Sequence, residues 1–153
     1  MREIKFRGKS CDEWVYGHLL KKEKDEVCCV NCESQHSNYL IQTDELDKYN
    51  EYDQYYITDD DTIGQYTGIK DENDIEIYEG DIIKFSYDAF IGNFDTFTAK
   101  GIVVFEDGAF FVNCLENERN IKDERFLLYE INIDVIEIIG NIYDNPELLK
   151  ESD

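Results

Sequence analysis

The sequence predicts a mainly β protein, a β-rich α+β fold with N-terminal strands and a small C-terminal barrel. Tyrosine (11 residues) and phenylalanine (9) dominate the aromatic residues, a composition that favours strands. Short apolar runs alternate with polar side chains and are separated by turn residues such as Asp107-Gly108. The close spacing of these runs after residue 82 predicts a small, curled, SH3-like β-barrel.

The chain is predicted to begin with a β-hairpin. Residues 2–8 alternate polar and apolar side chains, with Ile4 and Phe6 on one face. This alternation is the pattern of a half-buried strand. Residues 13–21 provide a second strand, and the polar residues between the two runs suit a turn.

Two further short strands are expected over residues 26–32 and 38–43, around a polar loop. The acidic, tyrosine-rich stretch 44–56 holds no single period for long. We therefore expect irregular chain there, with at most one helical turn capped by Asp44. Together these segments predict an N-terminal β region over residues 1–62 that carries an acidic, cysteine-rich insertion.

The remainder, residues 63–153, is predicted to be a small β-barrel domain, either separate from the N-terminal region or part of one compact domain. Residues 90–98 suit a long loop or hairpin tip, and Asp107-Gly108 predicts a type I′ turn. Its strands are expected at residues 64–69, 75–78, 82–87, 101–113 (a hairpin), 126–131 and 135–143.

A short helix is expected to follow the last strand. Asn145 is a suitable N-cap, Pro146 suits the first helical position, and Glu147 favours the positive N-terminal end. Leu148 and Leu149 would dock this helix on the rest of the domain.

The net charge of −21 is the most unusual global property of the sequence. Residues 43–81 hold fourteen acidic residues against Lys48 and Lys70, a net charge of −12. Direct binding to nucleic acid is not expected, because phosphate binding relies on lysine and arginine. No signal-like or membrane-spanning apolar segment occurs, and the cysteine count of five is odd. These features predict a cytoplasmic protein without membrane contact.

Three blocks of the sequence resemble the YopX family of phage and prophage proteins: REIKFRG at residues 2–8, GQYTGIKDENDIEIYEGDIIKF at 64–85 and IIGNIYDNPELL at 138–149. The resemblance implies a β-rich, phage-encoded fold with a small C-terminal barrel, in a bacterial host cytoplasm. It provides no catalytic residues to transfer. This chain has Asn73-Asp74 where the family has Asn-Gly, and the resemblance does not cover the stretch from Val27 to Tyr56.

Cys29, Cys32 and His36 form the only pattern that suggests a metal, a C-x₂-C-x₃-H spacing. A structural zinc site needs four converging ligands, and the fourth would have to be Cys11 or Cys114. Reduced thiols are the better interpretation. We therefore predict no metal and no cofactor, with these three residues as a weak zinc candidate.

The acidic runs and the two histidines do not predict catalysis. Residues 71–76 lack the oxygen, glycine and glutamate positions of a calcium loop, so a hairpin turn is the better interpretation. His18 and His36 have no adjacent nucleophile motif, and no phosphate-binding or dinucleotide fingerprint occurs. No catalytic residue is predicted.

The function that remains is a non-enzymatic accessory protein that binds a host or phage protein. An acidic mimic of nucleic acid that blocks a host DNA-binding protein is one alternative, and a structural homo-oligomer is another. Tyrosine side chains are enriched at protein interfaces. The predicted interaction surface consists of Tyr49, Tyr52, Tyr55, Tyr56, Asp59, Asp60 and Asp61.

Overall fold

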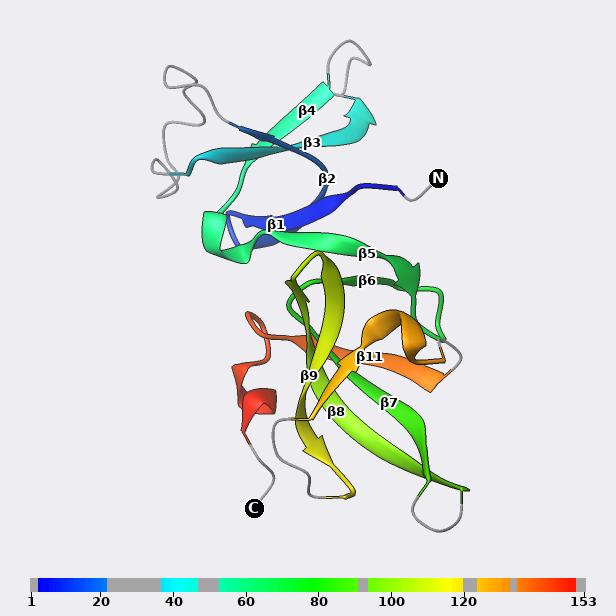
Figure 1. Cartoon of the computed structure of the whole chain (residues 1–153). Coiled ribbons are helices and arrows are strands. Elements are labelled where there is room, and N and C mark those ends of the chain that lie inside the picture. Colours follow the sequence, from blue (N-terminus) through cyan, green and yellow to red (C-terminus); the bar gives the residue numbers. More distant parts are fainter. Residues whose placement is uncertain are drawn as a thin grey trace. The chain divides into compact units, whose positions relative to one another are not determined.

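The computed structural model describes residues 3–21, 37–46, 53–90, 94–119, 124–132 and 135–150. It is a mainly β structure, as predicted, with two antiparallel sheets (Figure 1). Hydrogen-bonded neighbours run in the order β4-β3-β2-β1-β5-β6 in one sheet and β10-β9-β8-β7-β11 in the other. The chain divides into two compact units, Met1–Tyr66 and Thr67–Asp153, each of which is described by itself below.

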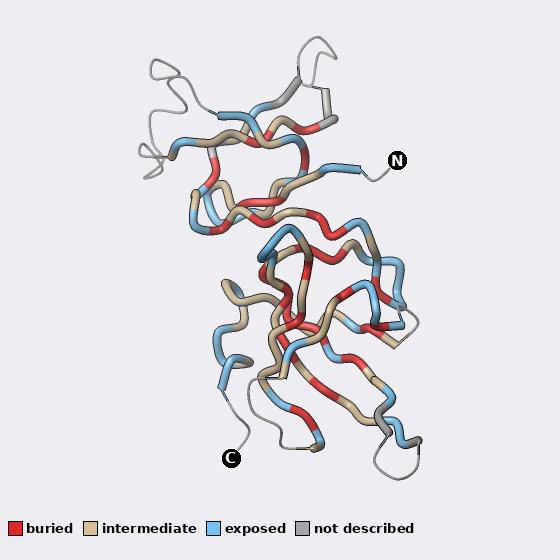
Figure 2. The backbone as a smooth tube through the Cα atoms, viewed as in Figure 1, coloured by how far each residue is buried: buried red, intermediate tan, exposed pale blue. Residues whose placement is uncertain are grey.

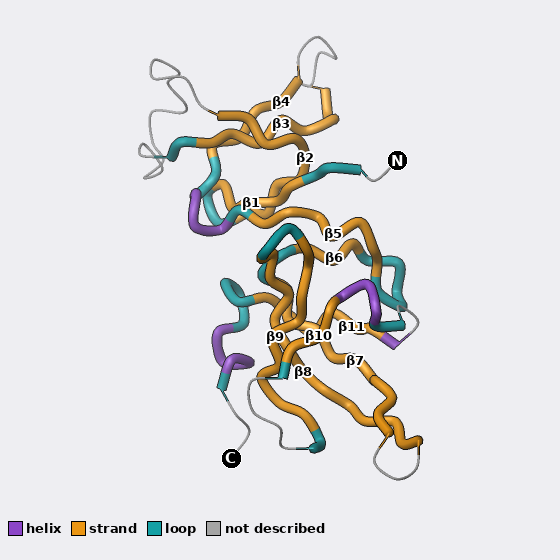
Figure 3. Tube along the Cα trace, viewed as in Figure 1, coloured by secondary structure: helices purple, strands orange, loops and turns teal. Residues whose placement is uncertain are grey.

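The described helices are all short 3₁₀ turns, so strands dominate both units (Figure 3). None of these helices is long and apolar enough to cross a bilayer. The strands are β1 (Phe6–Ser10), β2 (Glu13–Lys21), β3 (Tyr39–Leu46), β4 (Asp53–Ile57), β5 (Gly64–Lys70), β6 (Glu76–Tyr78), β7 (Asp81–Phe90), β8 (Phe94–Glu106), β9 (Ala109–Asn117), β10 (Arg125–Leu127) and β11 (Ile136–Asn141). The helices are η1 (Asp60–Thr62), η2 (Leu128–Glu130) and η4 (Pro146–Leu149).

The first unit opens with the predicted hairpin. β1 and β2 pair in antiparallel register from Phe6 opposite Gly17 to Ser10 opposite Glu13. The two turn residues, Cys11 (φ 50°) and Asp12 (φ 68°), are both left-handed. Two left-handed residues in a two-residue loop match the twist of the flanking strands, although glycine usually supplies this conformation.

The prediction of irregular chain over residues 44–56 is wrong for those of its residues that the structure describes. β3 continues to Leu46, and β4 pairs with β3 across a register shift between Thr43 and Leu46. These strands are defined by the pairing of β4 with β3 and by its register shift. Polar and apolar residues therefore do not alternate regularly along the stretch. The strand expected over residues 26–32 lies outside the described residues.

The second unit is built on long hairpins. β7 and β8 pair from Ile82 opposite Ile102 to Phe90 opposite Phe94. Of the two alternatives for residues 90–98, the hairpin tip therefore fits, and the long loop is wrong for the residues that belong to these strands. The β8–β9 hairpin confirms the predicted type I′ turn, because Asp107 and Gly108 both have positive φ angles, 51° and 81°.

The main hydrophobic core lies in the second unit, and buried residues recur along its long strands (Figure 2). Ile83 and Phe85 face this core from β7, since alternate side chains of a strand share a face. Phe85 also meets the ring of Phe126 edge-on, at 5.2 Å between centroids. The core residues are Ile77, Ile83, Phe85, Ala99, Val103, Phe110, Val112, Leu128, Ile131 and Ile136.

The turn between β5 and β6 is fastened to β11 by the buried carboxylate of Asp71. Its Oδ1 accepts hydrogen bonds from the backbone N–H groups of Asn73 and Ile75, both at 2.9 Å. Its Oδ2 accepts from the N–H of Ile138 in β11 at 3.3 Å. Burial opposes ionisation, but these backbone donors outweigh it and lower the pKa of Asp71. Residues 71–74 are therefore a structural turn, and Asp74 in it is left-handed (φ 68°).

Two finer predictions for the second unit have different outcomes. No pairing joins β10 to β11 within the described residues, so the sheet is open there and the SH3-like barrel stays a prediction. The C-terminal helix exists with Pro146 in its first turn, but it is a 3₁₀ turn. Asn145 is the N-cap residue of this turn, as predicted, but its side chain makes no capping hydrogen bond, because its Oδ1 accepts from the N–H of Asn141 instead.

Candidate functional site

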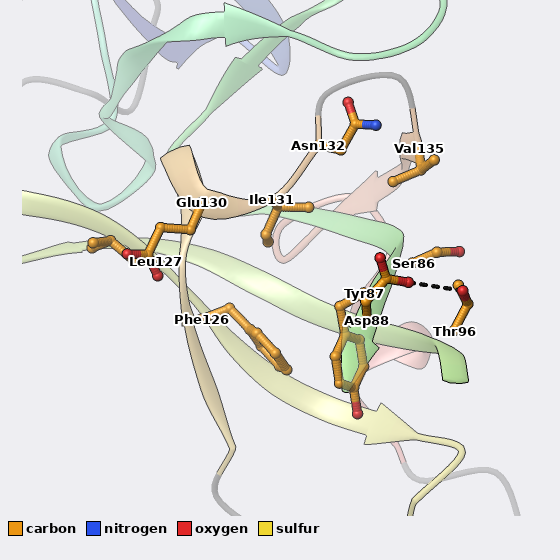
Figure 4. Close-up of a pocket in the computed structure, with 10 residues that line it drawn as sticks. All are labelled: Ser86, Tyr87, Asp88, Thr96, Phe126, Leu127, Glu130, Ile131, Asn132 and Val135. Atoms are coloured by element: carbon orange, nitrogen blue, oxygen red, sulfur yellow. Dashed lines mark hydrogen bonds between the residues drawn. The ribbon is translucent and has the colours of Figure 1, made fainter. Parts of the chain in front are cut away.

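A pocket of about 410 Å³ lies in the second unit, beside the second half of β7 (Figure 4). This volume falls within the roughly 300–1,000 Å³ range of ligand-binding pockets. Side chains from β7, β8, β10 and η2, and from the segments on either side of residues 133–134, contribute to it. The lining residues are Ser86, Tyr87, Asp88, Thr96, Phe126, Leu127, Glu130, Ile131, Asn132 and Val135.

Two aromatic rings form a rigid part of the lining. Tyr87 and Phe126 lie with their ring centroids 4.6 Å apart and their planes tilted by 55°. Tyr87 also contacts the ring of Phe97 at 6.0 Å between centroids. Pairs at these separations add to the stabilisation from burial and restrict ring movement. Tyr87 is therefore a positioned side chain, and its ring is available to a ligand on the pocket side.

The hydroxyl of Tyr87 is fixed at its far end by a small polar network. It donates to Glu124 Oε2 at 3.2 Å, and Glu124 Oε1 lies 3.6 Å from Arg119 Nη1. The guanidinium of Arg119 lies 5.5 Å from the ring centroid of Phe97. Burial, and then the negative charge of Glu124, raise the pKa of Tyr87. The phenol therefore stays protonated and keeps its ring in place at neutral pH.

Two carboxylates lie at the rim, and Figure 4 shows Asp88 and Glu130 on opposite sides of the aromatic pair in that view. Asp88 Oδ1 accepts from Thr96 Oγ1 at 2.8 Å, and both acidic residues are exposed. Neither takes part in an ion pair with a described residue. The lining thus contains two aromatic rings and two carboxylates that form no ion pair with a described residue, so its charge is negative.

A second, more open pocket of about 530 Å³ lies along β7, β8 and β9 and contains two lysines. Lys100 Nζ pairs with Glu116 Oε2 at 3.1 Å, and Glu118 Oε2 accepts from the N–H of Thr98 at 3.0 Å. Because these charges are engaged within the pocket, it offers less to an external ligand than the aromatic pocket.

The tyrosines predicted to form an interaction surface are only partly described. On β4, Tyr55 is exposed and Tyr56 is half-buried, and neighbouring strand residues face opposite sides of a sheet. Tyr49 and Tyr52 lie outside the described residues. The structure therefore places Tyr55 and Tyr56 on different faces, and the tyrosine-based surface stays a prediction.

The three predicted aspartates have local structural partners. Asp59 caps η1, with its Oδ1 accepting from the N–H of Asp61 at 3.2 Å. Asp60 accepts from Ser37 Oγ and from Asn38 Nδ2, each at 2.7 Å, and from the Asn38 N–H. Burial opposes ionisation, but these donors outweigh it and lower the pKa of Asp60. Asp59 and Asp60 therefore organise the chain before β5, whereas Asp61 is exposed.

The zinc candidate, Cys29, Cys32 and His36, lies outside the described residues and stays a prediction. Within the described ranges, no group of three or more histidine, cysteine, aspartate or glutamate residues is arranged to hold a metal ion. Cys11 is exposed and Cys114 half-buried, and both are free thiols. His18 lies on β2 in the first unit and is not among the residues that line the aromatic pocket.

Comparison with known proteins gives a family match over nearly the whole chain. Residues 5–150 match the family model described as YopX protein. The chain belongs to the YopX family. The resemblance to this family is thus confirmed, by a match that begins within the first of the three sequence blocks and includes the other two.

The search of solved structures gives a similar protein for this YopX-family chain. It is the crystal structure of protein EF1440 from Enterococcus faecalis, with 21% sequence identity and a TM-score of 0.48. The match covers 98% of this chain and 100% of that one. The comparison with curated proteins found no match.

Sequence reasoning missed the aromatic pocket of this YopX-family chain. Its lining comes from segments far apart in the sequence, from Ser86 to Val135, and no spacing rule connects them. One signal was available in the run IIKFSYD, since alternation places Phe85 in the core and Asp88 on the opposite face of the same strand. The contribution of Phe126 and Glu130 depends on the tertiary fold.

Proposed function

We propose that this YopX-family protein is a non-enzymatic accessory protein that binds a basic surface of a host or phage protein. In this proposal it is encoded by a phage or prophage and acts in the cytoplasm of the bacterial host. The observation that carries the proposal is the pocket beside β7, whose lining includes two aromatic rings and two exposed carboxylates that take part in no ion pair with a described residue.

The chemistry of the pocket supports recognition of a cation better than catalysis. Its lining has carboxylate, hydroxyl and amide groups, but it contains neither histidine nor cysteine. Nucleophilic catalysis normally pairs a nucleophile with a positioned base. The net charge of −21 adds long-range attraction for a basic partner, which speeds encounter. Both features favour a protein-binding module.

Affinity capture tests the proposal. Tagged wild-type protein and a variant with the acids of residues 44–53 changed to amides, which keeps the structural Asp59 and Asp60, are incubated with host lysate at low and high salt. A specific basic protein should be retained by the wild type, released by salt and lost from the variant, and then bind as a purified protein in calorimetry. A circular dichroism spectrum equal to that of the wild type controls for folding. Retention of no specific protein would contradict the proposal.

A mimic of nucleic acid is the second candidate, and the net charge of −12 over residues 43–81 favours it. In this case the partner is a DNA-binding protein, and the acidic chain occupies its DNA site. The captured protein should then lose DNA from a labelled duplex in proportion to the YopX-family protein added. Unchanged DNA binding at low salt would reject the mimic while leaving a protein-binding function in place.

A homo-oligomer is a third candidate, because β4, β10 and β11 are edge strands of their sheets in the described structure. Unpaired strand edges can join copies of a chain. The turn at Asp71 covers part of the β11 edge, which leaves less of that edge for pairing. Light scattering at micromolar concentration measures the mass, and a monomer would reject this candidate.

A further inference from the structure

One face of the β1–β2 hairpin points into the first unit. A Cβ atom added at Gly8 would lie 3.0 Å from Thr58 and 3.3 Å from Ile41, and both of these side chains are 0% exposed. Alternate side chains of a strand share a face, so the two neighbours of Gly8 along β1 lie on the opposite face of the hairpin. These neighbours are Arg7 and Lys9.

On this opposite face, cations from the first strand segment lie among aromatic rings of β2. Lys9 is paired opposite Trp14, and Arg7 is paired opposite Tyr16. Lys9 Nζ lies 5.5 Å and the Arg7 guanidinium 4.6 Å from the ring centroid of Trp14. Lys5 Nζ lies 5.9 Å from the ring centroid of Tyr16. These separations are within the range of cation–π attraction. Together these residues form the basic-aromatic face: Lys5, Arg7, Lys9, Trp14 and Tyr16.

The basic-aromatic face is positive although the chain is strongly acidic. Glu13 is the one acidic residue of β1 and β2, and alternation places it on the other face of the hairpin. The whole chain has 36 acidic and 15 basic residues, so three cations with no acid from either strand are a segregation of charge. At about 0.1 M salt, exposed charges more than about 10 Å apart are largely screened from each other. The net charge of −21 therefore does not exclude an anionic ligand on this face.

Aromatic side chains are accessible on this side of the sheet. Tyr16 is 43% exposed, and His18, the next residue of β2 on the same face, is also exposed. Gln42 of β3 is paired with His18 and with Tyr55 of β4, so Tyr55, which is 53% exposed, faces the same side. Arg7 is 6% exposed, so it holds a ring and contributes charge without direct contact with a ligand.

We infer that the basic-aromatic face binds single-stranded nucleic acid, with bases stacked on the exposed tyrosines and phosphates held by the half-buried Lys5 and Lys9. Proteins that bind single strands without sequence preference combine cations along the backbone with aromatic side chains on which bases stack. An acidic peptide would use the cations but not the rings, and a duplex keeps its bases stacked on each other. The inference does not rest on the proposed protein-binding function, because it concerns a different surface and a different class of ligand.

Titration of the full-length protein with a single strand tests the inference. The probe is a fluorescein-labelled deoxythymidine oligomer of about 12 nucleotides, a length within the site sizes of single-strand-binding proteins. The comparison ligands are the same strand annealed to its complement and a labelled glutamate peptide of equal charge. Binding is measured by fluorescence anisotropy at about 0.1 M salt. With unlabelled ligands, the emission of Trp14, the single tryptophan of the chain, reports binding at the face itself.

Two variants, each with a matched control, separate the ring from the charge. Tyr16→Thr removes the exposed ring and keeps a residue that suits a strand, and Lys9→Gln removes one cation. The controls are Tyr129→Thr and Lys84→Gln, which remove the same groups from exposed positions of the second unit. Circular dichroism and thermal unfolding verify that all four variants fold.

The single strand should bind the wild type at least about tenfold more tightly than the duplex or the glutamate peptide, and it should quench Trp14. Tyr16→Thr should weaken binding by about tenfold. Lys9→Gln should weaken it by about threefold and reduce the slope of log affinity against log salt by about 0.7, the value for one phosphate contact. Each control variant should change the affinity by less than about twofold.

Several results would overturn the inference: no binding of the single strand, equal binding of the duplex or the glutamate peptide, or equal losses in the variants and their controls. Binding that leaves the emission of Trp14 unchanged would place the ligand elsewhere and would also overturn it. These outcomes are separate from those of the affinity capture. A captured basic protein together with no single-strand binding would support the proposed function and reject this inference.

Discussion

Replacing Asp71 by asparagine tests how the turn between β5 and β6 is held to β11. The carboxylate is 6% exposed and accepts three backbone hydrogen bonds, from Asn73, Ile75 and Ile138. An amide keeps one oxygen for the two turn donors but directs an N–H₂ group toward the Ile138 N–H. The substitution therefore removes one bond and makes two others neutral. We expect a loss of about 2 kcal/mol in the free energy of unfolding.

Replacement by alanine removes all three acceptors and should cost more. Asn73 and Ile75 are exposed, so water can replace the carboxylate at those two donors, while the half-buried Ile138 N–H is harder to satisfy. We expect a loss of about 3 kcal/mol for Asp71→Ala. Urea unfolding followed by far-ultraviolet circular dichroism measures both variants, and Glu72→Gln in the same turn is the control for charge.

The pH dependence distinguishes a charged acceptor from a merely well-packed side chain. Because the pKa of Asp71 is lower in the folded state than its ordinary value of 3.8, its contribution is fully present above pH 3.8. The contribution is lost as the pH falls through the lower folded pKa. The difference between wild type and Asp71→Asn should therefore be constant near neutral pH and shrink below pH 3.8. An Asp71→Asn variant as stable as wild type at pH 7 would refute this reasoning.

Three substitutions test backbone geometry by the same unfolding assay. Asp74→Gly should stabilise the protein by up to about 1 kcal/mol, because φ is 68° and only an exposed ion pair with Lys70 is lost. A clear decrease in stability would mean that the Asp74 side chain contributes more than the backbone strain costs. Asp12→Gly, also at φ 68°, should have an effect of the same sign and size, and a fall in stability would argue against strain in that turn. Gly17→Ala should destabilise by about 3 kcal/mol, because the new Cβ would overlap the backbone carbonyl of Gln42, and wild-type stability would contradict this close approach.

The hairpins could be predicted from the sequence because their turns and alternation are local properties. Asp107-Gly108 has the backbone conformation that this residue pair favours, and residues 13–21 form a strand with the predicted bounds. The stretch 44–56 was missed because the pairing of β4 with β3 includes a register shift, which alternation does not reveal. For residues 90–98 the sequence left a long loop or a hairpin tip open, because it does not reveal that cross-strand pairing extends β7 and β8 beyond their apolar parts.

The candidate site could be predicted much less well than the fold. Carboxylates are abundant in this chain, with 36 acidic residues, so the sequence alone does not single out Asp88 and Glu130. Their role depends on the tertiary structure that brings β7 and η2 to one pocket. The predicted surface at Tyr55, Asp59 and Asp60 rested on local composition, whereas the structure engages both of these aspartates in backbone and side-chain hydrogen bonds.

The hydrogen bond from Ile138 to Asp71 joins residues 67 positions apart, and this separation has a consequence for the order of events during synthesis. β7 emerges from the ribosome long before β11, its neighbour at one edge of the sheet. Contacts of such long range form slowly, because the intervening chain must first be closed into a loop. In the nascent protein, the edge of β7 that later pairs with β11 therefore stays unpaired until β11 has been made. During that interval, pairing of β7 with other nascent chains competes with completion of the fold.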